Sequence, residues 1–450
     1  MSRPDRSSMM RDTGVARLLW QLSAPAAVGM VVQALYSVVD TMFVGRGVGV
    51  AAIAGVTITF PVHMFFLALG TAIGIGGASL ISRSLGAGER EKADYTAGMV
   101  LLLTIVTGIV FSVLSLLTLE PLLRLFGASA VIIGPAREYA AVILAGSVFF
   151  VVLVGGNSTV RAEGNASFAM YTMFLSAGLN VVLDAIFIFW LKRGVAGAAE
   201  ATVISWIAAC ALQQWYFQGG RSMLRFRLKY LKPDWKIIRE ILAVGASAFG
   251  RNAAGSLMAV FVNRSLVVYG GDMAIAAFGV VNRLLMFFAM PMFGIVQGFL
   301  PIAGFSFGNR RPDRVREVLR LGVYWSTGIS LVGFVLFMLF PGFFIGMFSS
   351  DPVLFGLGTA CLRIMVLVMP LIGFQMIGSS LFQALGHAGK AFFLSTARQI
   401  FFLVPLLLIL PPVYKLEGVW YAFPIADLLS FLVTLVFVAK EMAALKLREE

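Results

Sequence analysis

Charged residues are scarce in this sequence of 450 residues. They make up 13% of the chain, against roughly 25% in soluble domains, whereas 59% of the residues are hydrophobic. The mean hydropathy is +0.91. These values exclude an ordinary soluble protein and predict an all-α membrane protein that crosses the bilayer many times, with no soluble segment long enough to fold separately.

Cysteine and histidine are nearly absent as well. Cys210 and Cys361 fall inside apolar runs without metal-ligand spacing, so neither a structural disulfide nor a metal centre is expected. His63 and His387 stand alone in the sequence. A Walker-type lysine motif is missing, which argues against ATP hydrolysis. A cleavable signal peptide is not expected either, because the polar start is followed by a full-length apolar stretch.

Basic residues are abundant in the short loops between apolar stretches. The net charge of +13 is therefore explained by membrane topology and not by binding to nucleic acid. Most loop lysines and arginines gather on one side of the predicted spans, including the run 221–236, which is expected to contact anionic lipid. By the positive-inside rule, both termini are predicted to be cytoplasmic and the protein to reside in the cell membrane.

Twelve apolar stretches are each long enough for the ~20 residues that a spanning helix needs. They cover residues 18–45, 51–82, 94–118, 130–158, 167–191, 195–217, 237–268, 273–304, 317–345, 353–384, 391–412 and 418–440. The longest polar connection divides them six and six. The predicted organisation is a first lobe over 1–218, a cytoplasmic linker over 219–236 and a second lobe over 237–450.

The two halves resemble each other at a constant offset of 222 positions. Ala52-Ile-Ala54 recurs as Ala274-Ile-Ala276, and Arg161-Ala-Glu-Gly164 has its counterpart in Gln383-Ala-Leu-Gly386. Such an internal repeat predicts two pseudo-symmetric six-helix bundles around a central cavity, an architecture typical of secondary transporters.

Polar residues in four spans of the first half fall at a common depth. Asn180 and Asp184 are four residues apart in an apolar stretch, so they share one helix face. Counting ~1.5 Å per residue, Asp40, Tyr139 and Thr202 reach a similar level in the outer half of the membrane. A charge at the membrane centre costs roughly 2.5–3.5 kcal/mol on insertion scales, so these groups predict a functional site.

The first span extends this polar face. Gln33, Tyr36, Ser37 and Asp40 follow at three- and four-residue spacing, and Pro25 allows a kink earlier in the helix. A carboxylate pair with amide and hydroxyl oxygens suits coordination of a hard monovalent cation or transport of a proton. The alternative is that the two aspartates only tie helices together by hydrogen bonds.

These residues resemble the multidrug and toxic compound extrusion (MATE) transporters, most closely the DinF-like branch with its archaeal and bacterial members. The likeness rests on Asp40 in Gln33-Ala-Leu-Tyr36-Ser-Val-Val-Asp40, on the pair Asn180 and Asp184, and on Thr202. It covers nearly the whole chain. It implies cation-coupled antiport of amphipathic, often cationic, compounds by alternating access between V-shaped lobes.

The same resemblance implies roles for individual residues. Asp40, Asn180, Asp184 and Thr202 would form a cation site, with Tyr139 and Asn157 in its surroundings. In the second half, Asn263, at an offset of 223, aligns with Asp40, and Phe402 and Leu406 stand where the first half has Asn180 and Asp184. Coupling is therefore expected to reside in the first half alone.

The second half instead places arginines in its apolar stretches. They are Arg251, Arg283, Arg363 and Arg398, against Asp427 as the single acid. Because buried charges usually require partners, Arg363 or Arg398 is expected to pair with Asp427. The remaining arginines, Arg283 among them, are candidates to line the cavity and to contact an anionic or zwitterionic substrate group.

The sequence thus predicts a monomeric multidrug efflux antiporter for small amphipathic substrates, coupled to H⁺ or Na⁺ and without another cofactor. Two alternatives remain open. The membrane arginines favour a flippase for lipid-linked saccharide or lysophospholipid, and the two aspartates alone would fit an intramembrane aspartyl protease, although the expected glycine-rich context is missing.

Overall fold

The computed structural model describes residues 6–48, 50–126, 128, 132–348 and 351–446, and these residues are almost entirely helical, without a strand. The first half contains two short helices, α1 and α5, and six long helices, of which the fifth ends in a π-helical segment, η1. The bounds are α1 Arg6–Asp12, α2 Val15–Gly47, α3 Val50–Gly86, α4 Arg90–Leu117, α5 Leu119–Leu125, α6 Ile133–Ala162, α7 Ala166–Asp184, η1 Ala185–Trp190 and α8 Gly194–Gln218.

The second half repeats this pattern after a connection that contains one 3₁₀ turn, η2. Two of its helices, α9 and α15, each consist of two helical segments joined at a sharp kink where the chain changes direction. The bounds are η2 Leu228–Leu231, α9 Trp235–Gly308, α10 Pro312–Leu339, α11 Pro341–Gly346, α12 Pro352–Met365, α13 Met369–Ala384, α14 Ala388–Thr396, η3 Ala397–Leu403 and α15 Val404–Lys446.

The reversals divide α9 and α15 into two spans each. Gly271 has φ 67° and ψ −169°, a conformation essentially restricted to glycine, and Lys415 has φ 52° and ψ −133°. The described helices contain nine apolar segments long enough to cross a membrane, or ten when α12 and α13, bent by 53°, form one broken span. With both reversals counted, the prediction of twelve spans is confirmed.

The ends of the observed helices differ from the expected ones by several residues. The largest shift concerns the stretch 317–345, because α10 ends at Leu339 and a separate short α11 begins at Pro341. Phe340 leaves the helical conformation with φ −123° and ψ 41°, and Pro341 begins α11, a position where its missing N–H removes no helical hydrogen bond. In contrast, α2 continues through Pro25, where only the one hydrogen bond to the carbonyl oxygen of Gln21 is lost.

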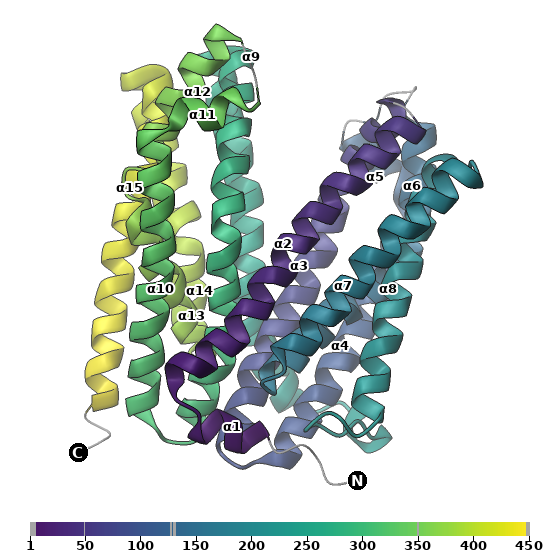
Figure 1. Ribbon diagram of the computed structural model, residues 1–450, viewed down its shortest axis with the longest axis vertical. Coiled ribbons are helices and arrows are strands. Elements are labelled where there is room, and N and C mark those ends of the chain that lie inside the picture. Colours follow the sequence, from purple (N-terminus) through teal and green to yellow (C-terminus); the bar gives the residue numbers. More distant parts are fainter. Residues whose placement is uncertain (1–5, 49, 127, 129–131, 349–350, 447–450) are drawn as a thin grey trace.

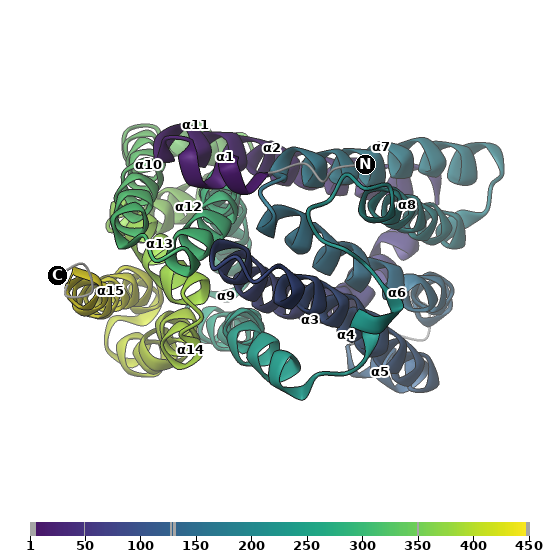
Figure 2. The same cartoon turned by 90° about the horizontal axis from the view of Figure 1, so that it is seen from below.

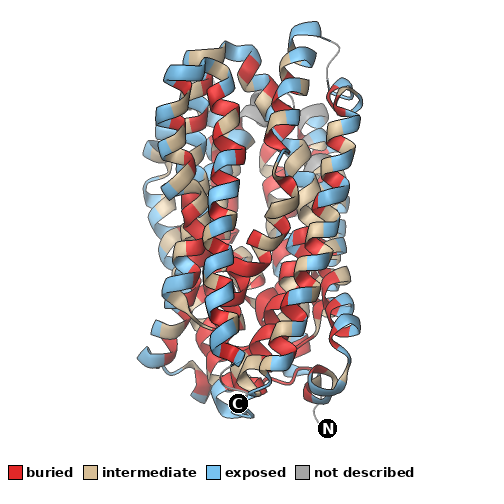
Figure 3. Ribbon diagram, turned by 90° about the vertical axis from the view of Figure 1, so that its left-hand side faces the viewer, coloured by how far each residue is buried: buried red, intermediate tan, exposed pale blue. Residues whose placement is uncertain are grey.

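Two bundles diverge from a common base, as Figure 1 shows. The first lobe (α2–α8) and the second lobe (α9–α15) meet at the end of the molecule where both chain termini lie, which we call the termini end. Buried residues concentrate toward this end (Figure 3). Its core joins Leu18 and Ile81 of the first lobe to Phe299, Val318 and Leu381 of the second.

The backbones of α3 and α9 are in contact at the termini end, because glycines of α3 have no side chain to hold the two helices apart. A Cβ on Gly76 of α3 would lie 2.0 Å from the carbonyl oxygen of Ile241, and one on Gly86 would lie 2.0 Å from that of Phe305. Figure 2 shows α3 and α9 side by side between the bundles. Since both the beginning and the end of α9 contact α3 here, the chain must reverse between them, at Gly271.

The N-terminal helix α1 lies across this base. Arg314 of α10 donates hydrogen bonds to the carbonyl oxygens of Met10 (3.2 Å) and Thr13 (2.9 Å) at the end of α1. Arg6, at its beginning, donates to the Tyr216 hydroxyl of α8 at 2.7 Å. Both lobes therefore hold α1.

Candidate functional site

The polar residues of the fifth span lie in the interior of the first lobe. Asp184 is fully buried and Asn180 is 2% exposed. Asp184 is the last residue of α7, and the next six residues wind as a π-helix, η1. Single π-turns within helices are frequent at functional sites, since the extra residue per turn alters which side chains point inward.

Asn180 connects the fifth span to the sixth. With its amide oriented to satisfy both neighbours, Asn180 donates to Oδ2 of Asp184 at 3.1 Å. Its oxygen accepts from the backbone N–H of Thr202 at 3.2 Å and faces the Thr202 hydroxyl at 3.1 Å. The three side chains that the sequence placed at one depth are thus one hydrogen-bonded group.

Asp40 of α2 completes the cluster. Its half-buried carboxyl group interacts with that of Asp184 at hydrogen-bonding range. Tyr36, one turn earlier on α2, and Tyr139 of α6 are near enough to interact electrostatically with both carboxyl groups. Three spans of the first lobe therefore supply one site, which we call the carboxyl cluster: Asp40, Asn180, Asp184 and Thr202. Tyr139 adds a fourth span, α6, to its surroundings.

One oxygen of this cluster has no donor. Oδ1 of Asp184 is buried and accepts no hydrogen bond from an N–H or O–H group of the described residues. Two carboxylates in contact repel each other, and a buried carboxylate oxygen without a donor is costly. A proton shared between the two groups, or a monovalent cation bound among the cluster's oxygens, would relieve both costs. The residues present therefore fit a coupling ion.

The other predicted residues of the first span lie along the same helix. Gln33 is exposed and Tyr36 is half-buried, whereas the side chain of Ser37 lies outside the described part of the structure. Pro25 is remote from the cluster, because the distance from 25 to 40 along α2 corresponds to about 22 Å. An effect of Pro25 on the cluster would have to be transmitted through α2.

Two predicted surrounding residues do not lie at the cluster. Asn157 is buried and accepts a hydrogen bond from Thr172 at 2.6 Å. The distance from Tyr139 to Asn157 along α6 is about 27 Å, which puts Asn157 near the termini end. Asn157 therefore ties α6 to α7 below the cluster, and Arg283 is an exposed residue of α9 in the other lobe.

In the second lobe, Arg398 is the partner of Asp427. Its Nε donates to Oδ1 of Asp427, and its Nη2 donates to Oδ2 at 3.2 Å. Arg363 is exposed and has no ion-pair partner among the described residues. The sequence left Arg363 and Arg398 as alternatives because both lie in apolar stretches, and the packing of η3 against α15 selects Arg398.

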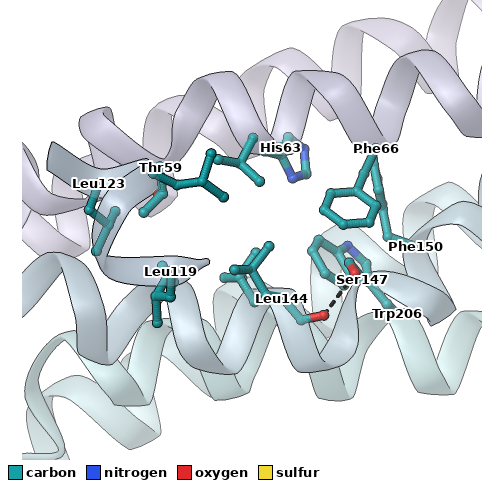
Figure 4. A pocket seen from close by; sticks show the side chains of 13 residues that line it. Thr59, His63, Phe66, Leu119, Leu123, Leu144, Ser147, Phe150 and Trp206 are labelled. Carbon is teal, nitrogen blue, oxygen red and sulfur yellow. Dashed lines mark hydrogen bonds between the residues drawn. The ribbon is translucent and has the colours of Figure 1, made fainter. Parts of the chain in front are cut away.

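An aromatic cluster in the first lobe was missed by sequence reasoning. The His63 ring of α3 lies 4.6 Å from the ring of Phe150 and 5.9 Å from that of Trp206. Figure 4 shows these side chains at one end of an apolar pocket, with Leu119 and Leu123 of α5 at the other end. The sequence carries no signal for this pocket, since its walls come from four helices that are distant along the chain.

Comparison with known proteins relates the chain to membrane transporters. The family profile described as MatE matches residues 25–186 and 249–409. Two similar proteins are the multidrug export proteins MepA of Staphylococcus haemolyticus, 25% identical over 92% of this chain and 91% of that protein, and of Staphylococcus aureus, 25% identical over 94% and 93%.

Solved structures show the same fold. The outward-facing conformation of a multidrug resistance MATE family transporter of the MOP superfamily aligns with a TM-score of 0.92 and 29% identity, over 99% of this chain and 100% of that one. A MOP superfamily transporter from Pyrococcus furiosus, described as having a binding pocket of reverse polarity that suggests a different function, aligns with the same score, identity and coverage.

Proposed function

Because this chain belongs to the MatE family of transporters, we propose that it is an efflux antiporter that exports small amphipathic compounds in exchange for H⁺ or Na⁺. The observation that carries the proposal is the carboxyl cluster, with the donorless Oδ1 of Asp184 beside Asp40. The similar proteins named as multidrug exporters support the substrate class.

The orientation follows from the loop charges. Lysines and arginines concentrate in loops at the termini end, so this end is cytoplasmic by the positive-inside rule and the membrane is the cell membrane. The two lobes then meet on the cytoplasmic side and diverge toward the outside (Figure 1). This arrangement is the one from which substrate leaves the cell.

The proposed cycle is a competition between ion and substrate. Arrival of a proton or cation between Asp40 and Asp184 removes the repulsion of the two carboxylates and draws α2 toward η1 and α8. α2 responds by bending near Pro25, where one backbone hydrogen bond is missing. The bend changes the inner surface of the first lobe and releases substrate outward.

Efflux of a fluorescent cationic dye from cells tests this function. Asp40→Asn and Asp184→Asn remove the negative charges but keep the side-chain size, so both variants should lose efflux. Glu120→Gln is the matched control, because Glu120 pairs with Arg124 on the surface at 2.8 Å, away from the cluster. Full efflux by both aspartate variants would refute the proposal.

The coupling ion is identified with proteoliposomes in which the Na⁺ gradient and the pH gradient are imposed independently. Uptake that follows the pH gradient alone assigns H⁺, and uptake that follows Na⁺ alone assigns Na⁺. Carboxylate, amide and hydroxyl oxygens serve either ion, so the geometry of the cluster supports both.

The second candidate is a flippase for lipid-linked saccharide or lysophospholipid. It is favoured by Arg251, Arg283 and Arg363, which lie in apolar helices and have no carboxylate partner among the described residues. Gradient-independent movement of a labelled lipid across liposome membranes, without dye efflux, would favour this function.

A further inference from the structure

Asp427, a buried acid of the second lobe, has no oxygen without a hydrogen bond. Asp427 is 2% exposed, and each of its two oxygens accepts a hydrogen bond from the guanidinium of Arg398. Oδ1 of Asp184, in contrast, is buried and has no hydrogen-bond partner among the described residues. Asp427 and Asp184 are therefore partnered in opposite ways.

The pair occupies the region that corresponds to the carboxyl cluster. At the repeat offset of 222, Arg398 matches Ser176 and Asp427 matches Ser205. Ser176 lies one turn before Asn180 on the fifth span, and Ser205 lies one turn after Thr202 on the sixth. Because these two spans run in opposite directions, Ser176 and Ser205 both lie one turn nearer the termini end than Asn180 and Thr202. The pair of Arg398 and Asp427 therefore bridges the fifth and sixth spans as Asn180 and Thr202 do, one turn nearer the termini end.

The backbone of the fifth span differs between the lobes at this level. Both fifth spans contain a π-helical segment, but η3 includes Arg398, whereas η1 begins after Asp184, at positions that do not match those of η3 at the repeat offset. One turn beyond Asp427, Ser430 accepts a hydrogen bond from Gln375 of α13. The second lobe thus keeps a buried polar bridge between helices.

We propose that Arg398 is a covalently attached counter-cation, which fills beside Asp427 the role that the exchanged ion fills in the first lobe and thereby excludes the second lobe from ion coupling. The part of this inference that concerns the first lobe rests on the proposed function. Guanidinium stays protonated in proteins and matches a carboxylate with two hydrogen bonds, so it cannot leave as a proton or Na⁺ can. Coupling then uses one site per transporter.

The surroundings of Asp427 contain no competing charge in contact with it. Among the described residues, Asp427 forms its hydrogen bonds and its ion pair with Arg398 of η3. The other helices packed against α15 are α9, α10, α12, α13 and α14. Their charged residues, such as Arg251 of α9 and Arg363 of α12, form no hydrogen bond or ion pair with Asp427 in the described structure, and Lys390 of α14 pairs with Glu441 instead. Removal of the Arg398 charge should therefore leave Asp427 dependent on an ion from solution.

The test measures the thermal unfolding midpoint of the purified full-length protein in detergent, between pH 5 and 8, with NaCl or choline chloride. Every variant is made in an Asp40→Asn/Asp184→Asn background, which removes the first-lobe carboxylates. In this background Arg398→Gln should introduce a new rise in the midpoint with Na⁺ or with falling pH. Arg398→Lys, which keeps the charge, should not.

The double change Arg398→Gln/Asp427→Asn is the decisive control. It should abolish the new ion response, because the carboxylate that lost its guanidinium partner is removed as well. A folded Arg398→Gln protein with the ion response of its background would overturn the inference, since the pair would then only tie η3 to α15. Where Arg398→Gln is unable to fold without an added ion, high Na⁺ or low pH should restore folding. If neither restores folding but the additional change Asp427→Asn does, the inference is also overturned, because the carboxylate then cannot use an ion from solution.

The outcome is separable from that of the proposed function. The midpoint requires no transport, so a new ion response in Arg398→Gln would stand even if the protein exported no dye. Conversely, dye efflux coupled to an ion in the wild-type protein would stand if Arg398→Gln showed no new response.

Discussion

Arg83 of α3 donates a hydrogen bond to Glu240 of α9 at 2.8 Å, so an ion pair crosses between the two lobes at the termini end. Nearby, the Ser79 hydroxyl donates to the carbonyl oxygen of Gln383 at 2.5 Å, and Gln383 donates to Ser247 at 3.1 Å. The Arg83–Glu240 and Ser79–Gln383 contacts join the two lobes, whereas the bond from Gln383 to Ser247 lies within the second lobe. In the alternating access proposed above, the two contacts between the lobes would have to break.

Loss of the Arg83–Glu240 pair should shift the conformational equilibrium away from the closed termini end. Glu240→Gln removes the negative charge and keeps the size of the side chain. The change in the free energy difference between the closed and open termini end should be small, about 0.5–1 kcal/mol, because both side chains are partly exposed. Distances between spin labels on the two lobes measure the shift. Glu120→Gln breaks a pair of the same length within the first lobe and should not alter those distances.

A side chain at Gly76 should separate the lobes. The added methyl group of Gly76→Ala would meet the Ile241 carbonyl oxygen at 2.0 Å, so backbone has to move, at a cost of about 1–3 kcal/mol. A lower unfolding midpoint and a more open termini end are expected. Gly328→Ala in α10, where nothing lies within 4 Å, is the control and should be neutral or slightly stabilising. Equal midpoints for the two variants would contradict the close approach.

Glu163 should make stability depend on pH. It lies in the loop after α6, where burial raises the pKa of its carboxyl group although Tyr216 and Ser222 donate to it. The folded protein therefore binds a proton more readily than the unfolded chain, so stability should decrease as pH rises from the ordinary glutamate pKa through the raised value. Glu163→Gln should flatten the pH dependence of the unfolding midpoint in this range. An unchanged slope would show that Glu163 titrates normally.

Asn180 should be needed for the carboxyl cluster although it has no charge. Asn180→Leu removes the donor to Asp184 and the acceptor for Thr202, which leaves buried polar groups without partners. Dye efflux should fall at least tenfold while the protein remains in the membrane. Asn157→Leu, below the cluster, separates this effect from a general loss of packing, because Asn157 bonds only Thr172 among the described residues. Equal losses in both variants would point to packing.

The sequence by itself determined the number of spans, the repeat and the common level of Asn180, Asp184 and Thr202. Depth is readable because the bilayer requires long apolar helices and each residue advances ~1.5 Å along one. Asn180, Asp184 and Thr202 were therefore placed at one level before their contacts were known. Their role in ion coupling stays a prediction.

Only the tertiary structure decided which groups meet at a given depth, because the rotation and the neighbours of a helix depend on packing between residues distant in sequence. It joined Asp40 to Asp184, selected Arg398 for Asp427, and put Asn157 beside Thr172 below the cluster. It also left Oδ1 of Asp184 without a donor while satisfying both oxygens of Asp427. The two lobes thus differ in how these two acids are partnered. The sequence could not show this difference, because hydropathy and residue spacing do not depend on whether a buried oxygen has a hydrogen-bond donor.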